Sequence, residues 1–170
     1  MQAIALGDQV IHCQQDGPAD GPALVFSNSL GTDLRVWTPM MAHLPRAARI
    51  VRYDTAGHGL SAHRGARGID EHAGDLVAVM DALGIERAVI VGLSVGGLIA
   101  QSLAASRPDR VAGLVLSNTA AKIGEREIWD ERIAAIERDG LDPMAETILE
   151  RWFSPRFRAE RPAELGLWRA

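Results

Sequence analysis

The sequence predicts an α/β fold built on a mostly parallel sheet flanked by helices. Three observations lead to this prediction: short apolar runs recur between residues 23 and 116, segments with helical periodicity alternate with them, and glycine or proline marks most boundaries. A continuous apolar run is typical of a strand that is buried on both faces. Alternating strands and helices favour parallel strands joined by right-handed crossovers.

The predicted strands follow from local patterns. Residues 4–6 and 10–13 flank Gly7 and Asp8, a pair suited to a tight turn, so we expect an N-terminal hairpin. Four apolar runs are the predicted strands of the parallel sheet: residues 23–26, 49–53, 88–91 and 111–116. After Asn118 no further strand is recognised.

Helices are expected between and after these strands. A short helix over residues 36–44 would end before Pro45, and another over residues 95–105 would end before Pro108. The clearest helix has apolar residues at three- and four-residue spacing from Ile69 to Leu83, with Gly84 at its C-terminus. Two more are expected later, one amphipathic helix around Trp129, Ile133 and Ile136 and one over residues 144–149.

The composition is that of an ordinary globular protein: 170 residues, a formal net charge of −4, 47% hydrophobic and 24% charged residues. Disordered, collagenous and coiled-coil chains are thereby excluded. Lys122 is the one lysine and the arginines are scattered, which argues against a nucleic-acid partner. No apolar run approaches the roughly 18 residues that span a bilayer, and the N-terminus lacks the pattern of a signal peptide. With Cys13 as the single cysteine, we expect a cytoplasmic protein without a membrane partner.

The segment most informative about chemistry is residues 92–97, Gly-Leu-Ser-Val-Gly-Gly, where a predicted strand meets a helix. In such a G-x-S-x-G turn the serine is strained and its hydroxyl is exposed above the sheet. We expect a Cβ at Gly92 or Gly96 to collide with neighbouring backbone. The helix that starts at Val95 directs free amides and its positive end at the same point. Ser94 is therefore the predicted nucleophile.

Other interpretations of this turn are weaker. A serine that merely occupies a tight turn between glycines is the plain alternative. A phosphate-binding loop is disfavoured, because neither G-x-x-x-x-G-K-[ST] nor G-x-G-x-x-G is matched. An acyl-transfer site also needs a second oxyanion donor, from the loop after the strand at residues 23–26. By position the two donors would be the backbone amides of Leu30 and Val95.

Five short segments make the chain resemble the α/β-hydrolases and, among them, the 3-oxoadipate enol-lactonases. The two narrowest motifs are Asn-Ser-Leu-Gly at 28–31 and Asn-Thr-Ala-Ala-Lys-Ile-Gly at 118–124. The five segments are residues 26–32, residues 52–61, residues 92–98, residues 117–124 and residues 150–153. The resemblance implies an α/β-hydrolase core over residues 1–120, followed by the start of a helical cap over residues 121–170.

The resemblance also implies a triad in the chain order Ser, acid, His. All five histidines precede Ser94 in the sequence: His12, His43, His58, His63 and His72. Asn118, not an acid, follows the fourth strand of the parallel sheet. We therefore expect the triad acid and histidine in a C-terminal segment beyond residue 170, in cis or as a second chain, and expect these 170 residues alone to be inactive. His58 is the tempting substitute base, although a structural role for it is favoured.

The activity implied is opening of the enol-lactone of 3-oxoadipate, a step of aromatic catabolism in the β-ketoadipate pathway, without a metal or organic cofactor. An anionic lactone calls for a cation near the pocket. Arg132 is one candidate, with Trp129 and Trp152 as possible walls. A solvated charge for Arg132 and a place in the cap core for the tryptophans are the alternatives, and Arg35 is another candidate cation.

Two other functions remain open at this point. The chain is also compatible with another α/β-hydrolase, such as an esterase, a C–C bond hydrolase or a cofactor-free haloperoxidase. A non-catalytic ligand-binding remnant of the fold is a third possibility, because no base follows Ser94. Truncation within the cap would leave residues 111–116 as a bare apolar sheet edge, which is an aggregation hazard.

Overall fold

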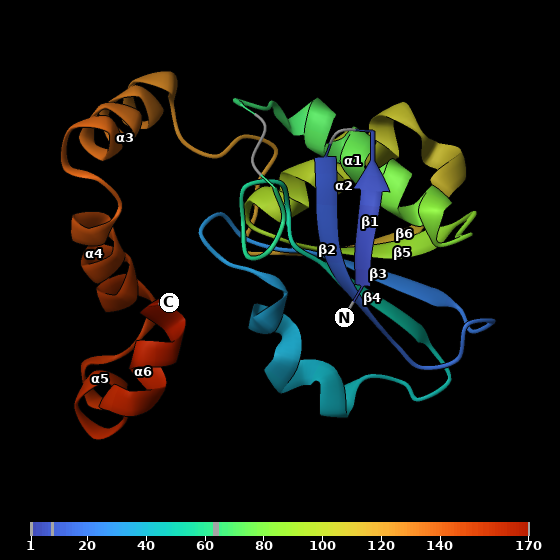
Figure 1. Cartoon of the computed structure of the whole chain (residues 1–170), viewed down its shortest axis with the longest axis horizontal. Coiled ribbons are helices and arrows are strands. Elements are labelled where there is room, and N and C mark those ends of the chain that lie inside the picture. The colour runs from blue at the N-terminus through green and yellow to red at the C-terminus, as the bar shows by residue number, and fades with distance from the viewer. Residues whose placement is uncertain (1, 8, 63–64, 170) are drawn as a thin grey trace. The chain divides into compact units, whose positions relative to one another are not determined.

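The computed structural model describes residues 2–7, 9–62 and 65–169 (Figure 1). The chain divides into two compact units, Met1–Ile123 and Gly124–Ala170. The first contains the sheet and the second only helices and their connections, within the described residues. None of the described helices is both long and apolar enough to cross a membrane.

The sheet of the first unit has six strands in the order β1-β2-β4-β3-β5-β6. They are β1 (Gln2–Leu6), β2 (Gln9–Asp16), β3 (Ala23–Ser27), β4 (Arg49–Tyr53), β5 (Ala88–Leu93) and β6 (Val111–Ser117). β3 pairs in parallel with β4 and β5, and β5 in parallel with β6, whereas β2 is antiparallel to β1 and β4. The mostly parallel sheet and the N-terminal hairpin are thus confirmed, although Asp8 of the predicted turn lies outside the described residues.

Both faces of the central strands are covered, which explains their continuous apolar runs. Successive residues of a strand alternate between two clusters of buried apolar side chains. Val25 and Ile90 belong to the first cluster, and Phe26 and Val91 belong to the second. The helices α1 (Ile69–Ala82) and α2 (Val95–Ser106) supply the first cluster, and the 3-10 helix η1 (Leu34–His43) supplies Trp37 to the second.

One element prediction needs correction, and one short element was not predicted. The short helix expected over residues 36–44 is a 3-10 helix, and it begins earlier, at Leu34, because the Asp33 carboxylate accepts the Arg35 amide at 2.7 Å and caps it there. A further 3-10 turn, η2 (Pro108–Arg110), precedes β6. β6 is an edge of the described sheet, as expected, and its Val115 is 49% exposed.

The second unit consists of four described helices: α3 (Arg126–Asp139), α4 (Asp142–Trp152), α5 (Pro155–Glu160) and α6 (Pro162–Arg169). The two predicted helices of this region are confirmed and extended as α3 and α4. The short helices α5 and α6 were not predicted. They begin with proline, and the rings of Phe153, Phe157 and Trp168 pack together there, with centroid separations of 4.8 and 5.8 Å.

Candidate active site

Ser94 lies at the junction of β5 and α2 with an unusual backbone conformation. Its φ and ψ are 56° and −117°, and Ser94 and Asn118 are the non-glycine residues with positive φ in the described part of the chain. The strained turn predicted from the sequence is therefore confirmed. Ser94 is half-buried and its side chain makes no capping bond to α2. The hydroxyl is consequently not occupied by the helix it precedes.

Close backbone packing around Ser94 explains the glycines. A Cβ on Gly92 would overlap Gly96 O and lie 2.6 Å from Gly97 Cα, and a Cβ on Gly96 would overlap Ser27 O and lie 2.6 Å from Asn28 O. Contacts this short do not occur in folded proteins, so both predicted requirements for glycine are confirmed. The first turn of α2 is thus packed directly onto the backbone that follows β3.

Two contacts from the end of β6 hold the turn. The Ser94 amide donates to Ser117 O at 3.0 Å, and the Thr119 hydroxyl donates to Ser94 O at 2.7 Å. Thr119 also fills the space beside Gly97, where an added Cβ would lie 2.6 Å from the Thr119 Cβ. These contacts offset part of the cost of the strained conformation.

Residues 28–33, here called the oxyanion loop, begin beside this turn because Ser27 pairs with Gly92. Asn28 is buried and anchors the loop: its Nδ2 donates to Tyr53 O at 2.8 Å and its Oδ1 accepts from Trp37 Nε1 at 2.6 Å. Among the described residues no acceptor is found for the amides of Leu30 or Val95. Both predicted donors are therefore backbone groups with unused N–H bonds.

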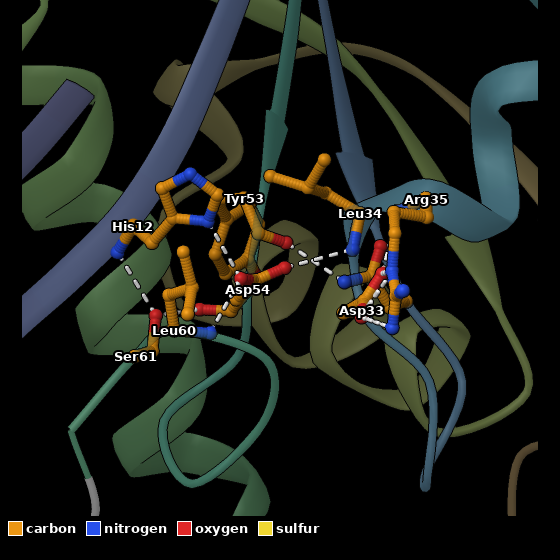
Figure 2. A network of polar contacts seen from close by, with 9 residues as sticks. His12, Asp33, Leu34, Arg35, Tyr53, Asp54, Leu60 and Ser61 are labelled. Carbon is orange, nitrogen blue, oxygen red and sulfur yellow. Dashed lines mark hydrogen bonds and ion pairs between the residues drawn. The ribbon is translucent and has the colours of Figure 1, made fainter. Parts of the chain in front are cut away.

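A buried carboxylate ties the glycine-rich loop of residues 54–61 to the first residue of η1, directly after the oxyanion loop (Figure 2). Asp54 is 1% exposed, and its Oδ1 accepts the Leu34 amide at 2.7 Å. Its Oδ2 accepts the Leu60 amide at 3.0 Å and lies 2.7 Å from His12 Nδ1. The Ser61 hydroxyl accepts the His12 amide and donates to Asp54 O. This network holds both loops at the carboxyl ends of β3 and β4.

His58 bonds to backbone, as the structural interpretation of it predicted. Its Nε2 accepts the Gly31 amide at 3.0 Å, and its Nδ1 lies 3.3 Å from Ala56 O. An imidazole nitrogen that accepts a backbone amide has no lone pair left for a serine proton. His58 in this conformation is therefore not the base for Ser94.

The other histidines are also placed away from that role. His12 is paired with Asp54, His43 is exposed on η1, and His63 lies outside the described residues. His72 is on α1, where burial lowers its pKa, the positive charge of Arg67 lowers it further and the Asp75 carboxylate opposes the shift. No described histidine is hydrogen-bonded to Ser94.

Arg35, the alternative candidate cation, is engaged with a neighbour (Figure 2). Its Nη2 lies 2.6 Å from Asp33 Oδ2, while the Arg35 side chain stays 57% exposed. Burial of Asp33 opposes its ionisation, but the hydrogen bonds from the Arg35 side chain and amide outweigh burial, and the pKa of Asp33 falls below its usual value. The pair leaves no net charge to attract an anion.

The three remaining candidates lie in the second unit. The Arg132 guanidinium is 5.6 Å from the Trp129 ring centroid, and Arg132 Nε lies 3.2 Å from Met144 Sδ. Trp152, the last residue of α4, is 44% exposed. These contacts join α3 to α4, and a role of the three residues in substrate binding remains a prediction.

Sequence reasoning missed the residues that support the site. Asp54 and Thr119 each follow the carboxyl end of a strand, which is where the parallel strands of a sheet direct functional groups. Asp54 could have been recognised from this position, because it directly follows a predicted strand and is the first residue of a glycine-rich loop. Thr119 lies within the motif at residues 118–124, but that motif does not reveal its contact with Ser94, which depends on the pairing of β5 with β6.

A protein-family model described as the alpha/beta hydrolase fold matches residues 22–147. The chain is an α/β-hydrolase. Relatives of this hydrolase include 3-oxoadipate enol-lactonase 2 of Acinetobacter baylyi, 43% identical over 147 residues that make up 86% of this chain and 55% of the relative. 3-Oxoadipate enol-lactonase 1 of the same organism is 39% identical and aligns with 88% of this chain and 56% of its own length.

The crystal structure of the enol-lactonase from Burkholderia xenovorans is similar to this α/β-hydrolase with a TM-score of 0.93 and 38% identity. The match covers 99% of this chain and 66% of that chain. The chain thus spans about half the length of the curated relatives it matches. The resemblance to the α/β-hydrolase family predicted from the sequence is confirmed.

Proposed function

We propose that this α/β-hydrolase carries the nucleophile and the oxyanion donors of a carboxylic-ester hydrolase that opens the enol-lactone of 3-oxoadipate. The observation that carries the proposal is the strained backbone of Ser94 at the head of α2. Such a conformation persists only where surrounding contacts maintain it, and it presents a hydroxyl next to free amides. The names of the relatives support the substrate.

In the proposed reaction Ser94 Oγ attacks the lactone carbonyl while a base takes the hydroxyl proton. The carbonyl oxygen becomes an oxyanion that the Leu30 and Val95 amides stabilise. Collapse of this intermediate breaks the ring C–O bond, and the enol oxygen leaves with a proton from the same group. The tethered enol tautomerises to the ketone, and water releases 3-oxoadipate from the acyl-enzyme. No step needs a metal or an organic cofactor.

The base and the acid that orients it are proposed to come from chain beyond these 170 residues, in cis or as a second chain. The bonds of His12 to Asp54 and of His58 to Gly31 support this, because they hold both rings against groups other than Ser94. Without the base we expect the chain to be inactive, since losing Ser or His in a comparable triad costs about a millionfold. A fully active species of 18.3 kDa with nothing bound would contradict this expectation.

For the anionic substrate we propose Arg132 as the cation, with Trp129 and Trp152 beside it. Arg132 already lies over the Trp129 ring, which would present the two groups together. Arg132→Ala should raise KM for the enol-lactone with little change in kcat, because uniform substrate binding is lost. An unchanged KM would remove Arg132 from the site.

The decisive test treats the complete protein, including the segment that supplies the base, with a fluorophosphonate probe and identifies the labelled peptide by mass spectrometry. We expect labelling at Ser94, its loss in Ser94→Ala, and full labelling in Ser102→Ala, a matched control whose hydroxyl bonds to Asp70 at 2.7 Å. Faster hydrolysis of the enol-lactone than of a panel of plain esters would then distinguish the proposed enol-lactonase from an esterase.

A second candidate function is ligand binding without catalysis. The observation that favours it is that His12 and His58 are bonded to other groups and that no described histidine is hydrogen-bonded to Ser94. If the protein binds the lactone but neither turns it over nor reacts with the probe, ligand binding is the function. Labelling at Ser94 eliminates this candidate.

A further inference from the structure

We propose that His58 is a positioning residue of the oxyanion loop: by accepting the Gly31 amide it fixes the direction of the neighbouring Leu30 amide. The inference rests on the proposed function, because it assigns Leu30 as an oxyanion donor. It adds a side chain, outside the nucleophile and the two donors, on which the rate should depend.

Both peptide groups that flank the Leu30 Cα are held. The Ser29 carbonyl accepts the Thr32 amide at 3.2 Å and the Thr32 hydroxyl at 2.8 Å. In a trans peptide the N–H points opposite to the carbonyl of the same group, so these bonds direct the Leu30 N–H away from Thr32. The next peptide is held at its other end, where the Gly31 N–H donates to His58 Nε2 at 3.0 Å.

The bond to His58 acts at the residue of the turn with the widest backbone freedom, and the Leu30 carbonyl of the same peptide accepts only a long bond of 3.5 Å from the Ser29 hydroxyl. Gly31 has a φ of +75°, and a Cβ built on it would meet nothing within 4 Å. Glycine has the widest conformational freedom of all residues, so sequence alone does not fix the turn. The bond to His58 removes that freedom at the residue next to the proposed donor.

His58 can do this in one protonation state. To accept the Gly31 amide, Nε2 must carry its lone pair, which places the ring proton on Nδ1. Nδ1 lies 3.3 Å from Ala56 O, an acceptor for that proton. The two backbone partners therefore select the neutral Nδ1–H tautomer.

The loop that carries His58 is itself held in place by backbone hydrogen bonds. The His58 amide donates to Thr55 O at 2.9 Å, and the Ser61 amide donates to His58 O at 2.9 Å. At the start of the loop, buried Asp54 accepts the Leu34 amide at 2.7 Å, just beyond the oxyanion loop (Figure 2). The glycine-rich loop thus holds the oxyanion loop on both sides of Thr32, at Gly31 and at Leu34.

The test compares two substitutions in the catalytically active form of the protein. His58→Phe keeps the ring shape but has no acceptor, whereas His58→Gln places an amide oxygen near the position of Nε2. We expect His58→Phe to lower kcat about tenfold, less than the ~100-fold loss of a whole oxyanion donor, with KM within about twofold. His58→Gln should restore most of kcat, and His43→Gln should match the wild type.

Amide hydrogen exchange at Gly31 gives a readout that does not depend on activity. We expect it to accelerate at least about tenfold in His58→Phe, corresponding to loss of one hydrogen bond, and to return towards the wild-type rate in His58→Gln. A wild-type kcat in His58→Phe, or equal impairment of both variants, would overturn the proposal. If the wild type neither turns over the lactone nor reacts with a fluorophosphonate, the proposed function fails instead. Gly31 exchange then decides alone whether His58 holds the loop: unchanged exchange in His58→Phe refutes it.

Discussion

At the scale of single residues, Ser94 shows how a reactive conformation is maintained. A positive φ on a non-glycine residue costs of order 1–3 kcal/mol. Against this act the bond from its amide to Ser117 O and the bond from the Thr119 hydroxyl to its carbonyl. Ser117 is the last residue of β6 and Thr119 follows it, so the geometry of the nucleophile depends on a strand that contributes no reacting atom.

Thr119→Val tests this dependence, because valine keeps the shape and removes the hydroxyl. We expect a loss of roughly 0.5–1.5 kcal/mol in the free energy of unfolding, measured by urea denaturation. We also expect slower labelling of Ser94 by a fluorophosphonate, with Thr119→Ser close to the wild type. Equal stability and labelling rates in all three proteins would show that the hydroxyl is dispensable.

Gly96 allows a prediction in which the same substitution has opposite signs at two positions. Gly96→Ala would push a methyl group into the backbone of Ser27 and Asn28, costing roughly 1–3 kcal/mol and separating the turn from the oxyanion loop. Gly74→Ala, on the exposed side of α1 with nothing within 4 Å, should instead stabilise by roughly 0.5–1 kcal/mol. Thermal melting measures both, and a destabilised Gly74→Ala would contradict the helix-propensity argument.

The candidate nucleophile could be predicted because its signal is local. A glycine, a serine and a second glycine between an apolar strand and a helix restrict the backbone to few conformations. The supports of the site could not be predicted in this way. Asp54 meets His12 and Leu34, and His58 meets Gly31, across 20 to 42 positions of sequence that carry no shared pattern. Only strand order brings those loops together.

At the scale of elements, apolar periodicity predicted the strands and long helices well. α1 and β4 match the expected ranges closely, because burial on a known face dictates their pattern. The short helices α5 and α6 carry too few turns for a period, and η1 starts early because of its Asp33 cap. Helix ends that are set by a side-chain hydrogen bond are the hardest to predict from a sequence.

On α1, His72 predicts how stability varies with pH. Burial, aided by Arg67 and His58 and opposed by Asp75, lowers its pKa in the folded protein. The unfolded chain therefore takes up the proton first, and the contribution of neutral His72 is present above the unfolded pKa of about 6.5 and is lost as pH falls below it.

His72→Gln should accordingly flatten the fall in unfolding free energy between about pH 7 and pH 5. His43→Gln, which removes an exposed histidine from η1, should leave the wild-type slope intact. Urea titrations at several pH values provide the measurement. If both variants keep the slope of the wild type, other groups cause it.

At the scale of the whole molecule, the sheet of the described chain ends in an apolar strand. Leu114, Val115 and Leu116 of β6 are 37%, 49% and 44% exposed. An exposed apolar edge strand pairs readily with another chain. We expect this 170-residue chain to self-associate as its concentration rises.

A lysine on this edge should prevent that association, because a charged side chain obstructs pairing of edges. Val115→Lys is expected to scatter less light than the wild type at equal concentration. Val10→Lys is the matched control: Val10 is 42% exposed but lies on β2, which has a neighbour on each side. Equal scattering by both variants would mean that exposed apolar area, rather than the edge, drives association.

The close approach of α2 to the segment after β3 has a consequence for how such a protein diversifies. Both proposed oxyanion donors are main-chain groups, and Gly96 leaves no room for a side chain between α2 and the backbone of Ser27 and Asn28. Mutation can therefore alter the residues that face a bound molecule while this backbone scaffold stays unchanged. Proteins that share this scaffold can therefore come to act on different acyl compounds while the reaction mechanism stays the same.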